Sequence, residues 1–116
     1  MLIISHSPLQ TISTLAIVNS DVTRDAIAAV SRDNIWIGLK EIVANKTWVT
    51  VDGDVNTYNG WADSQPNPEN SGALEEDKAL MMLADKKWHD YPSTSEFAFV
   101  CQKSEFFYYY LGEKPM

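Results

Sequence analysis

Oxygen-bearing side chains that could bind a metal ion occur in two separate stretches of the chain. They lie in residues 60–77, which include the amides Gln65 and Asn67 and the acidic run Glu75-Glu76-Asp77, and in Trp88-His89-Asp90. Calcium takes roughly six to eight oxygen ligands from carboxylates, amides and backbone carbonyls. Pro66 separates the two amides and restricts the backbone between them. These residue types therefore predict a calcium site, provided that the fold brings the two stretches together.

The same acids offer only weak support for catalysis. A hydrolase would use Glu76 with Asp77 or His89 as acid and base, which requires a suitable separation and shifted pKa values. Adjacent acids in a loop do not form such a pair. The sequence also contains no nucleophile elbow, phosphate-binding loop or zinc signature. We therefore expect a binding protein that is not an enzyme.

The elements that must position these residues are one helix and several short strands. Residues 20–31 begin with Ser20 or Asp21 as the N-cap and place apolar residues near helical spacing, which predicts an amphipathic helix packed on a sheet. Apolar or alternating runs predict strands. These runs are residues 35–39, 47–51, 79–83 and 97–101, with residues 87–90 as the turn and continuation of the third.

The connections between these strands are equally informative. Asp52-Gly53 is a strong hairpin-type turn signal. Residues 56–77 show little periodicity and contain several glycines and prolines, and such a long irregular loop in a small domain is usually functional. Few helices and many short strands around a long loop predict an α+β domain.

Composition limits the partners of this domain. A length of 116 residues supports one domain with a single core, and the hydrophobic fraction of 45% suits a globular interior. A net charge of −7 argues against nucleic acid, because phosphates are met by clusters of Lys and Arg. No apolar run approaches the roughly 20 residues of a membrane span, and residues 1–20 lack the basic start of a convincing signal peptide.

Several segments, taken in order, resemble the C-type lectin-like domain over roughly residues 14–103. They are Leu15-Ala16 with the following helix, Trp36-Ile37-Gly38-Leu39, Thr47-Trp48 through Asp52-Gly53, Trp61 with Gln65-Pro66-Asn67, Glu76-Asp77, Trp88-His89-Asp90, and Phe99-Val100-Cys101-Gln102. The resemblance implies small mixed or antiparallel sheets, one or two helices and a long ligand-binding loop. It divides the chain into an N-terminal segment at 1–13 (a truncated first strand or helix region), the domain at 14–103 and an aromatic extension at 104–116.

The resemblance also implies a function and its residues. It makes Gln65, Asn67, Glu76 and Asp90 the side-chain ligands of one calcium ion, and it makes the peptide before Pro66 cis. A carbohydrate would place two vicinal hydroxyls on the ion and exchange hydrogen bonds with the surrounding side chains. The carbohydrate-binding set is Gln65, Asn67, Glu76, His89 and Asp90.

Two departures from the family pattern keep alternatives open. His89 stands where the family usually has Asn, and its nitrogen suits zinc or copper better than calcium. Gln65-Pro66-Asn67 is a hybrid of the family's mannose-type Glu-Pro-Asn and galactose-type Gln-Pro-Asp motifs, so it does not indicate which sugar is preferred. The alternative function is a calcium-independent module that binds protein. The simplest alternative is that there is no calcium site. In that case the prolines and amides are ordinary loop-forming residues, and the acids are solvated surface residues.

The family resemblance also has implications for the disulfides and for the cellular location of the protein. By resemblance, Lys78 and Ser93 stand where the family has its long-loop disulfide, and Cys101 lacks its helix partner. Losing a disulfide costs about 2–5 kcal/mol, which the core must offset. We expect that core to contain Trp36, Leu39, Trp48, Trp61, Trp88 and Phe99, with Cys101 as a small buried hydrophobe. The family resemblance implies an extracellular or cell-surface location.

The end of the chain carries a further apolar run. Residues 106–111 are aromatic apart from a final leucine and are strongly strand-prone. We expect this segment either to pair back on the sheet or to pair with a second copy of the chain, which would make a homo-oligomer. The alternative interpretation is a disordered tail.

Overall fold

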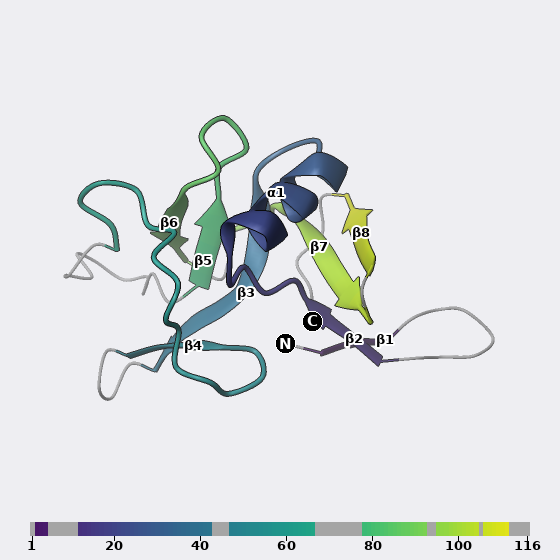
Figure 1. Cartoon of the computed structure of the whole chain (residues 1–116), viewed down its shortest axis with the longest axis horizontal. Coiled ribbons are helices and arrows are strands. Elements are labelled where there is room, and N and C mark those ends of the chain that lie inside the picture. Colours follow the sequence, from purple (N-terminus) through teal and green to yellow (C-terminus); the bar gives the residue numbers. More distant parts are fainter. Residues whose placement is uncertain are drawn as a thin grey trace.

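The described part of the chain forms one sheet with one helix on it. The computed structural model describes residues 2–4, 12–42, 47–66, 78–92, 95–104 and 106–111. Their elements are β1 (Leu2–Ile4), β2 (Ile12–Leu15), α1 (Asp21–Val30), β3 (Ile35–Ile42), β4 (Thr47–Thr50), β5 (Lys78–Met81), β6 (Trp88–Tyr91), β7 (Ala98–Lys103) and β8 (Phe106–Tyr110). Figure 1 shows their arrangement. The predicted α+β class is confirmed.

The helix begins where its sequence provides a cap. Ser20 has an extended backbone, and its hydroxyl accepts a hydrogen bond from the backbone N–H of Thr23 at 3.0 Å. Such a cap stabilises a helix by about 1 kcal/mol. Ile27 and Ala28 are buried against the sheet, so the predicted amphipathic helix and its Ser20 cap are confirmed.

β7 is the central strand of the sheet. The strand order is β1-β2-β7-β3-β5-β6, with β4 paired to β3 and β8 paired to β7. β7 runs antiparallel to β2 and β8 and parallel to β3. The predicted hairpin turn at Asp52-Gly53 is present, because Val49 bridges Val55 and Gly53 takes the positive φ of 92° that a glycine allows.

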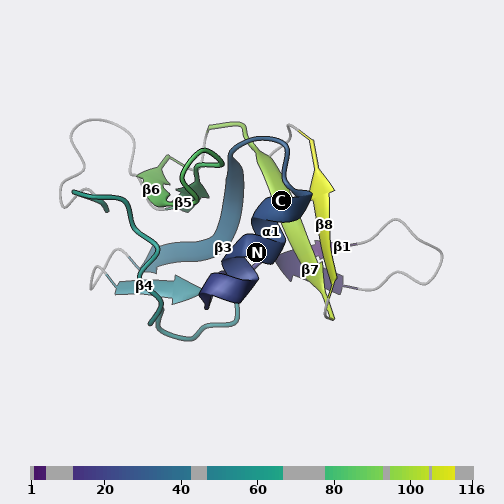
Figure 2. The same ribbon diagram turned by 45° about the horizontal axis from the view of Figure 1, so that its top comes forward.

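The core occupies both faces of this sheet. On one face, α1 packs over β3 and β7, as Figure 2 shows, and buries Ile27 with Ile35 and Val100. The other face carries a second cluster, formed by Leu15, Trp36, Leu80, Phe99 and Cys101. The Cys101 side chain is only 1% exposed, as expected for a small buried hydrophobe.

Both ends of the chain add strands to the sheet. β8 pairs antiparallel with β7 over the register from Lys103↔Phe106 to Phe99↔Tyr110, which confirms pairing on the chain's own sheet. β1 pairs with β2, and β2 pairs with β7 through Leu15↔Cys101. The sequence predicts a truncated first strand or helix region at residues 1–13, and in the structure β1 and the start of β2 lie within this segment.

Candidate functional site

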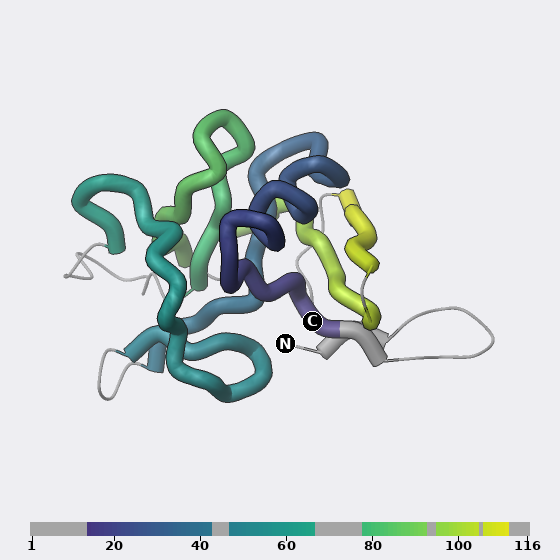
Figure 3. The backbone as a smooth tube through the Cα atoms, in the orientation of Figure 1, coloured from purple at the N-terminus to yellow at the C-terminus, as the bar shows by residue number. Residues whose placement is uncertain are grey.

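Residues 60–62 of the long loop are hydrogen-bonded to β6. Figure 3 traces residues 51–66 from the end of β4 past β6. Trp88 donates its backbone N–H to the carbonyl of Gly60 at 2.8 Å, and Ala62 donates to the carbonyl of Trp88 at 3.0 Å. Trp61 and Trp88 form a parallel bridge. The loop is therefore fixed to the strand that carries Asp90.

Gly60 permits this close approach. A Cβ atom at this position would overlap the indole ring of Trp88. Any other residue would have to displace a side chain that is 1% exposed. Sequence reasoning did not identify this role, although a glycine directly before a tryptophan at the start of a loop was the available signal.

Three indole rings lie behind the loop and form what we call the tryptophan cluster: Trp48, Trp61 and Trp88. Trp48 and Trp61 have ring centroids 4.8 Å apart, and Trp61 and Trp88 have centroids 5.4 Å apart. Both pairs meet edge to face, the arrangement that aromatic quadrupoles favour. In this packing Trp61 and Trp88 support the loop, and Trp48, Trp61 and Trp88 belong to the core cluster or pack against it, as expected from the sequence.

Polar contacts tie this region to α1. The Tyr58 hydroxyl donates a hydrogen bond to Asp21 Oδ1 at 2.6 Å, and its ring lies 5.8 Å from that of Trp88. The hydrogen bond to the Asp21 carboxylate raises the pKa of Tyr58. On the turn between β5 and β6, Lys86 Nζ lies 3.1 Å from Asp25 Oδ1. The helix therefore contacts both segments that flank the predicted site.

Two of the predicted calcium ligands are brought together across 25 residues of sequence. Gln65 Oε1 accepts a hydrogen bond from the backbone N–H of Asp90 at 3.3 Å. A turn positions Gln65, whose own N–H donates to the carbonyl of Ala62 at 3.0 Å. The Gln65-Pro66 peptide is cis, as the resemblance implied. The side chain of Asp90 is buried, with 4% exposure.

The remaining predicted residues are placed differently. His89 is half-buried on β6, where burial alternates so that Trp88 and Asp90 belong to one side of the strand and His89 and Tyr91 to the other. Asn67 and Glu76 lie outside the described residues. The structure thus positions one amide and one acid of the predicted ligand set, and leaves the roles of all five site residues as predictions.

The donors present suit a hard cation. Gln65 and Asp90 offer amide and carboxylate oxygens, the ligand types that calcium prefers. In the part of the chain that the structure describes, no group of three or more His, Cys, Asp or Glu side chains forms a metal centre. Asp90 is the one predicted acidic ligand within that part, so a complete calcium shell would need residues of 67–77 as well.

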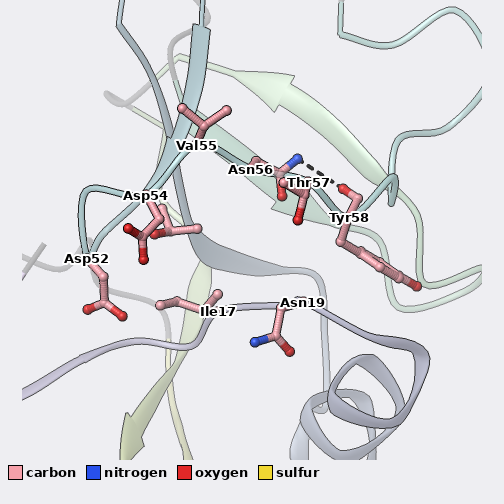
Figure 4. A pocket seen from close by; sticks show the side chains of 9 residues that line it. Ile17, Asn19, Asp52, Asp54, Val55, Asn56, Thr57 and Tyr58 are labelled. Carbon is pink, nitrogen blue, oxygen red and sulfur yellow. Dashed lines mark hydrogen bonds between the residues drawn. The ribbon is translucent and has the colours of Figure 1, made fainter.

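A separate polar pocket lies beneath the β4 turn. It has a volume of about 230 Å³ and lies between the turn after β4 and the segment that leads into α1. Figure 4 shows Asp52 and Asp54 on one side of it and Asn19 on the other, with Asn56 Nδ2 donating to the carbonyl of Tyr58 at 2.9 Å. None of the predicted ligands lines this pocket.

Known proteins resemble this chain in sequence and in structure. Mouse tetranectin is 27% identical over 95 residues, which cover 77% of this chain and 47% of tetranectin. A C-type lectin mannose-binding isoform of Oxyuranus scutellatus is 36% identical over 73 residues, which cover 62% of this chain and 45% of that protein. The chain thus spans about half the length of these curated relatives.

The structural likeness covers more of the chain. The carbohydrate-recognition domain of the mouse scavenger receptor C-type lectin superimposes with a TM-score of 0.60 and 25% identity, covering 89% of this chain and 72% of that one. No helix among the described residues is long and apolar enough to span a bilayer. The family model for the lectin C-type domain matches residues 10–103. The chain therefore belongs to the C-type lectin domain family.

Proposed function

We propose that the chain binds carbohydrate through a calcium ion held by Gln65, Asn67, Glu76 and Asp90. The hydrogen bond from the Asp90 N–H to Gln65 Oε1 carries this proposal, because it joins the two separate stretches that contain the predicted ligands. The residue type of Asp90 supports it further, because carboxylate oxygens are among the ligands that calcium prefers.

The family narrows the function to binding. C-type lectin domains bind carbohydrate or protein and are not enzymes. One relative is named for mannose, which supports a sugar as the ligand class. The pairing of amides at 65 and 67 matches neither family sugar motif, so both mannose and galactose belong in the test.

The residues would perform distinct tasks in this site. A bound calcium ion supplies a positive charge that two vicinal sugar hydroxyls can coordinate. The amides of Gln65 and Asn67 can both donate and accept hydrogen bonds, whereas the carboxylates of Glu76 and Asp90 only accept them. His89 is proposed as an additional contact to the sugar. Because two of the four proposed ligands are neutral amides, only Glu76 and Asp90 contribute negative charge. We therefore expect weak calcium affinity.

Weak affinity suits the location that the family resemblance implies. Extracellular calcium modules work with dissociation constants of about 0.1 to 1 mM. We therefore propose an extracellular or cell-surface setting, in which a site of this affinity would be occupied.

Calorimetric titration with calcium chloride tests the metal. We expect millimolar binding and a higher melting temperature, because a ligand that binds only the folded state stabilises it. Asp90→Asn keeps the shape of the side chain but removes its charge, and should weaken calcium binding by about tenfold or more. The control is Asp63→Asn, which changes an exposed acid in the loop that contains Gln65 and should leave binding unchanged.

Retention on mannose and galactose resins, with calcium and then with a chelator, tests the sugar. We expect the unaltered chain to be retained in the presence of calcium and to be released by the chelator. The Asp90→Asn variant should not be retained. Calcium that neither binds nor stabilises the unaltered chain would contradict the proposal and favour the calcium-independent protein-binding alternative.

A further inference from the structure

Exposed aromatic side chains are concentrated on one strand. Phe106, Tyr108 and Tyr110 alternate along β8 and are 63%, 46% and 44% exposed. Leu111 follows directly and is 75% exposed. The intervening Phe107 and Tyr109 pack against the core on the side of α1. β8 therefore has one face turned into the molecule and one aromatic face open to solvent.

β8 is also an edge strand in the described part of the chain, where its partner is β7. Edge strands present backbone N–H and C=O groups that another strand can bind, and proteins usually block them with charges, prolines or bulges. The five residues of β8 are all Phe or Tyr and pair with β7 in unbroken register. None of these blocking features is present within the strand.

We propose that a second copy of the chain pairs with this edge, β8 antiparallel to β8, around a two-fold axis at Tyr108. In this register Tyr108 faces Tyr108 of the second copy, and Phe106 faces its Tyr110. Each exposed ring then has a ring opposite it, at the separation of roughly 5 Å that cross-strand pairs have. The sequence is therefore self-complementary about its central residue.

The backbone fits the same register. Two residues connect β7 to β8, and the register pairs Lys103 with Phe106 directly across this connection. A two-residue hairpin closes on a hydrogen-bonded pair, and pairs then alternate along the ladder. It follows that Phe107 and Tyr109 direct their N–H and C=O groups to the free side. Around an axis at Tyr108, Phe107 meets Tyr109 of the second copy, and both can exchange hydrogen bonds.

Charge favours this edge as the contact between copies. The chain carries a net charge of −7, so two copies repel each other over much of their surface. β8 contains no charged residue. Self-pairing here brings uncharged aromatic strands together, whereas an acidic face would add like charges.

The available area predicts a weak dimer. If an aromatic side chain presents roughly 200 Å², the exposed parts of the three rings amount to about 300 Å² per copy. A standard interface buries about 800 Å² per partner. We therefore expect reversible dimers at high micromolar concentration, at the weak end of specific association. Two linked domains would also bind a multivalent glycan more tightly than one.

Sedimentation equilibrium of the unaltered chain, over concentrations up to about 1 mM and in the presence of a chelator, tests the dimer. The chelator makes the result independent of the proposed calcium site. We expect a monomer–dimer equilibrium. Tyr108→Lys places two like charges opposite each other across the axis and should raise the dissociation constant by about tenfold or more. Val22→Lys, at an 80% exposed position of α1, should leave it unchanged. A purely monomeric chain at the highest concentration overturns the proposal.

Cysteine cross-linking tests the register. All three cysteine variants also carry Cys101→Ala, because Cys101 lies opposite Tyr108 on β7. Tyr108→Cys should form a disulfide-linked dimer on mild oxidation, since the residue faces itself. Phe106→Cys should not cross-link alone, but should do so when mixed with Tyr110→Cys. Equal cross-linking of Phe106→Cys and Tyr108→Cys alone overturns the two-fold axis at Tyr108.

Discussion

Two groups of aromatic rings in this small domain have opposite surroundings. The tryptophan cluster is packed between the loop and β6, where Trp88 is 1% exposed. The rings of Phe106, Tyr108 and Tyr110 stand on β8 and are about half exposed. Composition alone does not separate the two groups, because both are aromatic and both lie on or beside strands.

The difference shows that the role of an aromatic residue depends on where its strand lies in the sheet. Trp88 belongs to a strand whose free side is already covered by the loop, so its ring supports a site. Tyr108 belongs to a strand that lies at an edge of the sheet formed by the described residues, and its ring remains available to a partner. Three experiments can break or sharpen this contrast.

Truncation of one ring from each group gives the largest expected effect. Trp88→Ala should lower the free energy of unfolding by about 3–5 kcal/mol, because it removes a fully buried indole and leaves a cavity. Tyr108→Ala should cost less than about 1 kcal/mol in the monomer, because its ring loses little contact. Urea denaturation of both variants at low protein concentration measures the difference. Equal losses would remove the contrast between the two groups.

The contact between Gly60 and Trp88 gives a smaller effect. Gly60→Ala should cost about 1–3 kcal/mol, because the added methyl group overlaps the indole ring. In a Trp88→Leu background the same substitution should cost much less, since the ring is gone. The double-mutant cycle from urea denaturation isolates this coupling. Additive losses would show that the loop does not depend on close approach to Trp88.

The hydrogen bond between Tyr58 and Asp21 gives the smallest effect and depends on pH. Tyr58→Phe should cost at most about 1 kcal/mol near neutral pH. The pKa of Tyr58 is raised above its ordinary value of 10.0 in the folded state. The contribution is therefore complete below pH 10.0 and is lost as pH rises through the folded pKa.

Denaturation of both proteins across that range measures the change. The stability of the unaltered chain should approach that of Tyr58→Phe at alkaline pH. A difference that stays constant with pH would exclude the hydroxyl as its cause.

Local signals in the sequence were sufficient for much of the fold. The Ser20 cap, the Asp52-Gly53 turn and the apolar runs each depend on neighbouring residues, and the structure places these elements close to their predicted bounds. β2 was not predicted as a strand, because its pairing with β7 depends on residues near the other end of the sequence, and β1 in turn pairs with β2. For β8 the sequence predicted a strand, but strand propensity does not determine which edge the strand joins.

The site could be predicted only in part, for a similar reason. Family resemblance connected Gln65 with Asp90, and the structure places them within a hydrogen bond of each other. The supporting contacts of Gly60 and Tyr58 depend on close packing with Trp88 and α1, which no motif encodes. Asn67 and Glu76 lie beyond the part of the chain that the structure describes, so their roles remain proposals.

The tryptophan cluster also gives the molecule a natural optical reporter. Three of its four indoles are coupled edge to face, directly behind the loop that contains Gln65. Indole emission and near-ultraviolet dichroism respond to small changes in ring packing. Movement of the loop would therefore be detectable on the unlabelled protein, without attaching a dye near the proposed sugar site.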